Sequence, residues 1–154
     1  MTEKPTYEEL ERQTKELHNE ALMLREEKET IQEQLNLSKL ILSATPDLIV
    51  LKDRDFTYQA VNPSFCEFLG KTEGSIIGKT DFDLFPGSEA EMYRRDDLKV
   101  IETGRSQFQD EEVTGEEGKR WLRVAKTPVF SKKGASIGVL CSVVDVTNRA
   151  CSIF

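Results

Sequence analysis

SATPDLIVLKDRDFTYQAVNPSFCEFLG, residues 43–70, predicts a helix end followed by a pair of strands, and this succession decides the fold. Pro46 ends the preceding helix, because the residue before a proline disfavours helical backbone angles. The apolar run 48–51 has the composition of a strand. The polar residues 53–55 then predict a turn into a second strand at 56–61.

Short helices are expected after this pair of strands. Asn62 and Pro63 favour a helix start, because an Asn side chain caps the first turn and proline lacks an amide hydrogen that would be unpaired there. Gly70 is expected to end that helix. Glycine and proline break residues 71–88 into brief turns, and residues 89–103 show the apolar spacing of a longer helix.

Three more strands are predicted near the C-terminus. They span residues 106–114, 119–129 and 136–146, with glycine-containing turns between them. The order of elements is therefore a long helix, two strands, several short helices and three strands. This order predicts an α+β domain.

Upstream of the domain, residues 1–42 predict a coiled coil that dimerises. Leucine or isoleucine recurs every seven residues, and a second series lies three positions before each of them. The predicted dimer seam is formed by Leu10, Leu17, Leu24, Ile31 and Leu35. Lys28 falls in the second series, where a polar residue helps to fix register and strand number. We predict a parallel dimer; the alternative is an amphipathic helix that lies on its own domain.

The composition fits one globular domain and the helix. The chain has 154 residues, of which 38% are hydrophobic and 32% charged, and its net charge is −7. A direct nucleic-acid partner is not expected, because phosphate binding needs a basic face. No apolar run approaches the ~20 residues of a membrane span, and the Glu-rich N-terminus does not resemble a signal peptide. A cytoplasmic location is therefore expected.

Three cysteines, Cys66, Cys141 and Cys151, show no CxxC spacing. They predict neither a disulfide framework nor a zinc site. Cys66 and Cys141 are interpreted as small buried side chains, with redox sensing as the alternative.

Taken in order, these segments resemble the PAS family of sensory domains over residues 38–149. The resemblance rests on SATPDLIVLKD (43–53), VNPSFCEFLG (61–70), IIGKTDFDLFP (76–86), GKRWLRVAKTPVF (118–130) and GVLCSVVDVT (138–147). It implies a five-stranded antiparallel sheet, with short helices closing a pocket on one face and the N-terminal helix covering the other. The implied division is a dimerisation helix at 1–42, a sensory domain at 43–147 and the start of an output linker at 148–154.

The resemblance implies a regulatory role. Such a module senses a small ligand, a cofactor or a partner and relays its state through the helix to an output such as a histidine kinase or a cyclase. Asp145 and Thr147 would form the signal exit. Neither a nucleophile paired with a base, a phosphate loop nor a metal-ligand pattern is apparent, so an enzyme is not expected. The alternative is a ligand-free dimerisation and interaction module whose pocket is filled by its own side chains.

The cofactor stays unknown at this point. Light-sensing flavin relatives carry a reactive cysteine where this chain has Asp81, which argues against a covalent flavin adduct. Haem-binding relatives use a pocket histidine, whereas the single histidine here, His18, falls in the predicted coiled coil. A Cys66 or Met92 haem ligand and a non-covalent flavin remain open.

Strand alternation, with the pairing that the resemblance implies, gives a predicted pocket. In residues 119–129, Trp121, Arg123 and Ala125 would face the covering helix, and the alternate residues would face the pocket. The predicted lining is Ile49, Phe65, Phe68, Leu69, Phe82, Phe85, Tyr93, Val100, Leu122, Val124, Lys126, Val139, Cys141 and Val143.

Lys126 is the one charged residue in that lining. A buried ammonium needs a partner, and the candidates are Asp81, Asp83, Asp97 or the carboxylate of a ligand. An internal ion pair would hold segment 78–88 against the sheet. Asp81 and Asp83 have a further interpretation as turn residues that cap a short helix.

Overall fold

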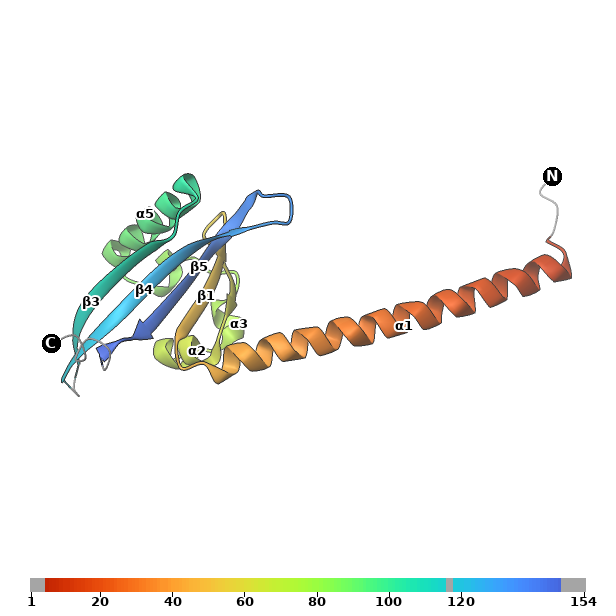
Figure 1. The fold of residues 1–154 in the computed structure, drawn as a ribbon, viewed down its shortest axis with the longest axis horizontal. Helices are drawn as coiled ribbons and strands as arrows, with labels where there is room; N and C mark the ends of the chain where they lie inside the picture. Colours follow the sequence, from red (N-terminus) through yellow and green to blue (C-terminus); the bar gives the residue numbers. More distant parts are fainter. Residues whose placement is uncertain (1–4, 116–117, 148–154) are drawn as a thin grey trace. The chain divides into compact units, whose positions relative to one another are not determined.

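The computed structural model describes residues 5–115 and 118–147. The chain divides into two compact units, Met1–Ile41 and Leu42–Phe154. The first unit consists mainly of α1 (Tyr7–Ala44), a helix of 38 residues and about 57 Å (Figure 1). The five predicted seam side chains are 46–65% exposed on this helix. Their apolar surface is free for a second helix, and the dimer stays a prediction.

The second unit contains a five-stranded sheet, as predicted. Its strands are β1 (Leu48–Asp53), β2 (Tyr58–Val61), β3 (Gln107–Gly115), β4 (Gly118–Phe130) and β5 (Ser136–Asp145). They lie in the order β2-β1-β5-β4-β3, and every neighbouring pair is antiparallel. The fold class is therefore confirmed.

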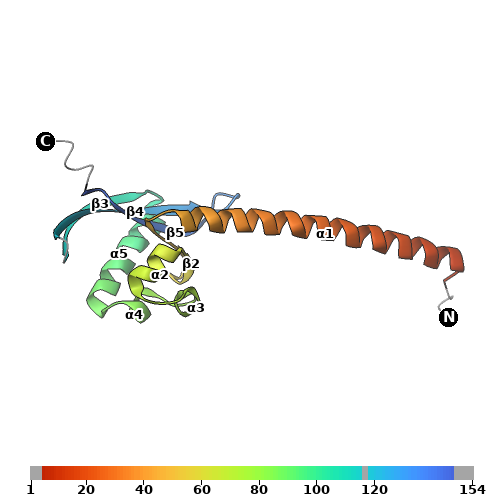
Figure 2. The same ribbon diagram turned by 90° about the horizontal axis from the view of Figure 1, so that it is seen from below.

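Four helices lie together on one face of this sheet (Figure 2). They are α2 (Pro63–Leu69), α3 (Glu73–Ile76), α4 (Asp81–Leu84) and α5 (Gly87–Thr103). The core between the two layers is formed by Val50, Tyr58, Val61, Phe65 and Ile76. That α1 covers the opposite face stays a prediction. Cys151 and the predicted linker at 148–154 lie outside the described residues.

The register of the strands determines which side chains face the helices. Val50 pairs with Cys141 across β1 and β5, and Cys141 pairs with Lys126 across β5 and β4. Directly opposed residues share a face, and alternate residues of a strand do too. Lys52 therefore faces the helices with Val50. Ile49 faces the other way, so its predicted place in the pocket is wrong.

Gly138 allows β1 and β5 to approach closely. A Cβ at this position would lie 2.0 Å from the carbonyl oxygen of Lys52, which is backbone and cannot rotate away. We expect Gly138→Ala to lower the free energy of unfolding by about 2 kcal/mol, measured by chemical denaturation.

Gly74→Ala is the matched control, because a Cβ there meets no atom within 4 Å. It should leave stability nearly unchanged. Equal effects of the two substitutions would contradict the strand contact as the reason for the glycine.

Candidate functional site: an internal cavity with a buried charge cluster

A cavity of about 330 Å³ lies between the helices and the inner face of the sheet. Its volume is near the lower end of the range for small-molecule sites. Nine of the residues predicted to line a pocket do line it: Phe65, Phe68, Phe85, Tyr93, Leu122, Val124, Lys126, Cys141 and Val143. The walls are thus mainly apolar and aromatic, and their charged residues come from β1, β3, β4, α4 and α5.

Four other predicted lining residues lie elsewhere. Val100 and Val139 are buried in the packing around the cavity, at 0% and 1% exposure, and do not reach its wall. Leu69 packs against the hydrophobic core. Phe82 is half exposed, and its ring lies 5.4 Å from the guanidinium of Arg94 at the surface.

Two lysines and two aspartates form a buried cluster beside the cavity, and all of them except Asp97 belong to its lining. Lys52 Nζ lies 2.7 Å from both carboxylate oxygens of Asp81 and 2.8 Å from Asp97 Oδ2. Lys126 Nζ lies 2.7 Å from Asp97 Oδ1 and also donates to the Tyr93 carbonyl at 3.2 Å. Asp97, on α5, therefore bridges lysines on β1 and β4. We call Lys52, Asp81, Asp97 and Lys126 the charge cluster.

The charge cluster is buried and balanced. Its four residues are at most 7% exposed, and their formal charges cancel. Burial of one unpaired ion costs free energy, so the two lysines can be buried here only because the two aspartates balance their charges. Lys52 was missed in the sequence because it falls between the predicted strand 48–51 and the predicted turn 53–55, whereas β1 extends to Asp53.

Asp83 does not belong to the charge cluster. Its carboxylate accepts hydrogen bonds from the Thr80 amide at 2.8 Å and the Thr80 hydroxyl at 3.0 Å, which completes a capping box on α4. These bonds, the amide first, lower the pKa of Asp83. The capping interpretation therefore describes Asp83, and its candidacy as a partner of Lys126 was wrong.

Tyr58 and Cys141 are neutral groups at the cavity wall. The Tyr58 hydroxyl donates to Asp81 Oδ1 at 2.7 Å, and burial, followed by the charge of Asp81, raises the pKa of Tyr58. Burial also raises the pKa of the Cys141 thiol. Cys141 is therefore protonated near neutral pH and a weak nucleophile. No cluster of three potential metal ligands occurs among the described residues.

Asn62 connects the cavity wall to the last turn of α1. Its side-chain oxygen accepts from the amides of Ile49 and Phe65 at 3.0 and 3.1 Å. Its side-chain nitrogen donates to the carbonyls of Asp47 at 2.7 Å and Leu42 at 3.3 Å. The buried amide thereby joins β1, α2 and the end of α1, and α2 carries two aromatic residues of the cavity.

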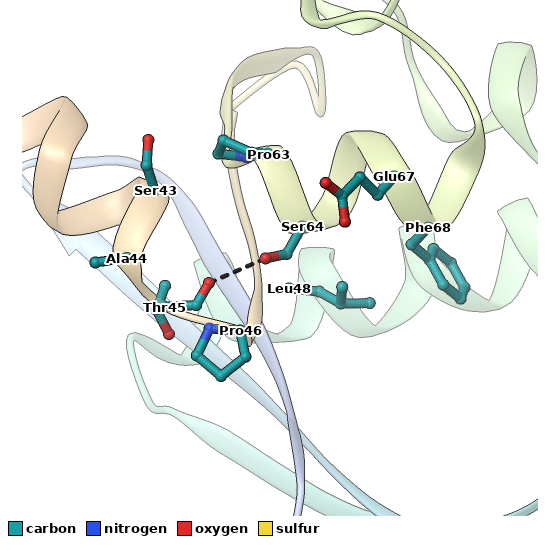
Figure 3. Close-up of a pocket in the computed structure, with 9 residues that line it drawn as sticks. All are labelled: Ser43, Ala44, Thr45, Pro46, Leu48, Pro63, Ser64, Glu67 and Phe68. Atoms are coloured by element: carbon teal, nitrogen blue, oxygen red, sulfur yellow. Dashed lines mark hydrogen bonds between the residues drawn. The ribbon is translucent and has the colours of Figure 1, made fainter.

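A surface groove marks the same junction (Figure 3). It is lined by residues 43–46 and by Leu48, Pro63, Ser64, Glu67 and Phe68. The Ser64 hydroxyl donates to the Thr45 carbonyl at 2.9 Å across this groove. The end of α1 and the start of α2 are thus linked by both Asn62 and Ser64.

The PAS fold family model matches residues 42–150. The chain belongs to the PAS family. The match covers the whole cavity-bearing sheet and its helices. It agrees with the resemblance found in the sequence, and the fold is a regulatory one.

Relatives of this PAS domain occur in much longer proteins. An uncharacterized protein of Sinorhizobium fredii, y4lL, is 31% identical over 70% of this chain and 13% of the relative. A probable histidine kinase of Oryza sativa is 28% identical over 71% and 11%, and a diguanylate cyclase of Vibrio cholerae is 26% identical over 75% and 37%. This chain therefore spans well under half of the length of these relatives.

Solved PAS structures share the fold. The PAS domain of BvgS from Bordetella pertussis superposes with a TM-score of 0.61 at 20% identity, over 82% of this chain and 95% of that one. VqmA from Vibrio cholerae, solved in a complex with a ligand and DNA, gives a TM-score of 0.60 at 26% identity, over 75% and 50%. The described part of this PAS domain contains no helix long and apolar enough to cross a membrane.

The residues predicted as the signal exit adjoin β4. Trp121 accepts from the Val146 amide at 2.8 Å and its own amide donates to Thr147 Oγ1 at 3.0 Å. Asp145 accepts from the Thr147 amide at 2.9 Å, and its hydrogen bonds with Thr147, the hydroxyl first, lower the pKa of Asp145. The end of β5 is thereby fastened to β4, and its role in signalling stays a prediction.

Proposed function

We propose that this PAS domain is a sensory module whose cavity binds a small molecule, and that α1 of two copies relays the bound state to an output partner. The observation that carries the proposal is the cavity itself. A PAS domain filled by its own side chains would leave no such volume, whereas here a mainly apolar cavity ends in a set of fixed charges and hydrogen-bonding groups.

The proposed route of the signal begins at α2. Phe65 and Phe68 on this helix line the cavity. A ligand that binds more tightly when α2 is in one position would therefore increase the fraction of molecules that have α2 in that position. Asn62 and Ser64, at the start of α2, bond to Leu42 in the last turn of α1 and to Thr45 directly after it. A shift of α2 would then move the C-terminal end of α1, where the predicted coiled coil meets the domain.

The output partner is proposed to be a kinase or a cyclase. This is supported by the relatives named a histidine kinase and a diguanylate cyclase, which share the PAS segment. The VqmA structure with ligand and DNA makes a DNA-binding output a second possibility for proteins that carry this module.

Native mass spectrometry, with an absorption spectrum of the same sample, tests the ligand. We expect a bound small molecule on the purified full chain. Val143→Phe, which adds bulk to the cavity wall, should lower the affinity for that molecule at least about tenfold.

Val144→Phe is the matched control, since the next residue of β5 faces the opposite side of the sheet. It should leave ligand affinity unchanged. Bare polypeptide mass, together with no effect of Val143→Phe on any added ligand, would favour the interaction module with a filled pocket.

The coiled coil is tested by analytical ultracentrifugation. A glutamate at position 17 would place two like charges in the seam and remove buried leucine from both helices. Leu17→Glu is therefore expected to weaken the dimer by roughly a hundredfold or more.

Asn19→Glu adds the same charge two residues away, outside the seam, and should leave the dimer intact. A wild-type chain of monomer mass, or a Leu17→Glu chain of unchanged dimer affinity, would contradict the seam.

A further inference from the structure

The charge cluster limits the ligands that the cavity can accept. A lone buried lysine would call for an acidic ligand, because its charge would need a partner. Here Lys52 and Lys126 are both paired with aspartates of the protein. An anionic ligand would therefore add an uncompensated charge in place of cancelling one.

The lining also contains two acidic residues outside the charge cluster. Asp96 and Glu111 belong to the lining, with the uncharged side chains of Gln107 and Gln109. Apart from Lys52 and Lys126, the lining holds no basic residue. An anion would thus meet carboxylates in the lining and find no unpaired lysine or arginine among the described residues that line the cavity.

One N–H group of the charge cluster has no acceptor among the described residues. Each ammonium has three N–H groups. Lys52 has three acceptor contacts, from the two oxygens of Asp81 and from Asp97. Lys126 has two among the described residues, Asp97 and the Tyr93 carbonyl. The Tyr93 ring, 5.5 Å from Lys126 Nζ, adds a cation–π contact but no lone pair.

The remaining walls favour a ring. Phe65 comes from α2, Phe85 directly follows α4, and Val124 and Val143 come from the sheet, so a flat apolar body would be held between two apolar layers. The cavity volume of about 330 Å³ limits that body to a small molecule.

We infer that the cavity binds a small, uncharged ring compound whose carbonyl or ring nitrogen accepts a hydrogen bond from Lys126. This inference rests on the proposed ligand-sensing function and specifies its ligand class. Lys126 supplies one charged donor, the aromatic and aliphatic side chains supply apolar walls, and the acidic residues Asp96 and Glu111 disfavour anions. A cation is disfavoured beside Lys126, whose ammonium is the group with a free donor.

The experiment compares three probes with the same ring. Benzamide is neutral and carries a carbonyl acceptor, benzoate is an anion, and benzylamine is a cation at neutral pH. Each is added at up to millimolar concentration to the full chain, and binding is followed by ligand-observed NMR and calorimetry. We expect benzamide to bind at least about tenfold more tightly than benzoate or benzylamine.

Two variants locate the contact. Lys126→Met keeps the aliphatic stem and removes the donor, and it should weaken benzamide about tenfold, to near the affinity of the two ions. Lys133→Met, at an exposed lysine in the turn before β5, should leave all three affinities unchanged. If Lys126→Met does not fold, the ¹³Cε signal of Lys126 in the wild-type chain should shift on addition of benzamide, and that of Lys133 should not.

The outcomes distinguish the inferred ligand class from the proposed ligand-sensing function on which it rests. Tighter binding of benzoate or benzylamine, or benzamide binding without any response of Lys126, would overturn the ligand class and leave the sensory cavity standing. Failure of all three probes to bind, on a chain that also carries no molecule from its host, would overturn the ligand-sensing function itself.

Discussion

Asp97→Asn is expected to lower the free energy of unfolding by about 3 kcal/mol, because one carboxylate balances two buried lysines. The amide keeps the shape of the side chain and loses its charge. Lys52 would retain Asp81, whereas Lys126 would keep only the neutral Tyr93 carbonyl and an amide oxygen. Urea denaturation followed by circular dichroism measures the change.

A second substitution separates lost charge from lost packing. In the Asp97→Asn/Lys126→Met chain the unbalanced ammonium is gone, so we expect the double variant to be more stable than the sum of the single effects by over about 1 kcal/mol. Asp96→Asn, on the neighbouring residue of α5, is the control and should cost little. An Asp97→Asn chain as stable as the wild type would show that the lysines do not depend on this carboxylate.

Asn62→Ala is also expected to lower the free energy of unfolding by about 3 kcal/mol. The substitution removes four hydrogen bonds of a side chain that is 1% exposed, and each contributes roughly 0.5 to 1 kcal/mol. Denaturation gives the total loss. Hydrogen exchange should show faster exchange at the Ile49 and Phe65 amides.

Ser64→Ala provides the comparison, because it removes a single bond at the same junction and should cost about 1 kcal/mol. If the effect of the ligand passes from α2 to α1, Asn62→Ala should also abolish the effect of the ligand on α1, while the ligand still binds in the cavity. Equal costs for Asn62→Ala and Ser64→Ala would argue that Asn62 is merely one more helix cap.

The sequence was sufficient for the fold because its signals are local. Asn62 with Pro63 at the start of α2, and Gly70 at its end, are features of neighbouring residues, and the structure has both caps. The ordered segments then identified the sheet. The cap could be predicted, but the bonds of Asn62 to Leu42 and Asp47 could not, since those partners are 20 and 15 residues away.

The faces of β1 could not be read from its own sequence. Residues 48–51 are all apolar, so alternation does not say which of them face the helices. Only the pairing of Val50 with Cys141 decides it. Once that register is known, Lys52 follows on the same face, and its approach to Asp81 and Asp97 becomes a consequence of the fold. Lys126 was predicted from alternation in β4 only together with the strand pairing that the PAS resemblance implies.

The strand order leaves β3 at one edge of the sheet, nine residues long. A long edge strand can recruit another strand and start aggregation. Here Asp110, Glu111 and Glu112 follow one another along it, so a second copy pairing at this edge would oppose carboxylate with carboxylate. A hydrogen bond from Arg123 holds the pKa of Asp110 below its usual range, so this carboxylate stays ionised in mild acid as the partner of the guanidinium. The acidic edge of β3 is therefore expected to disfavour polymerisation of the domain through its own sheet.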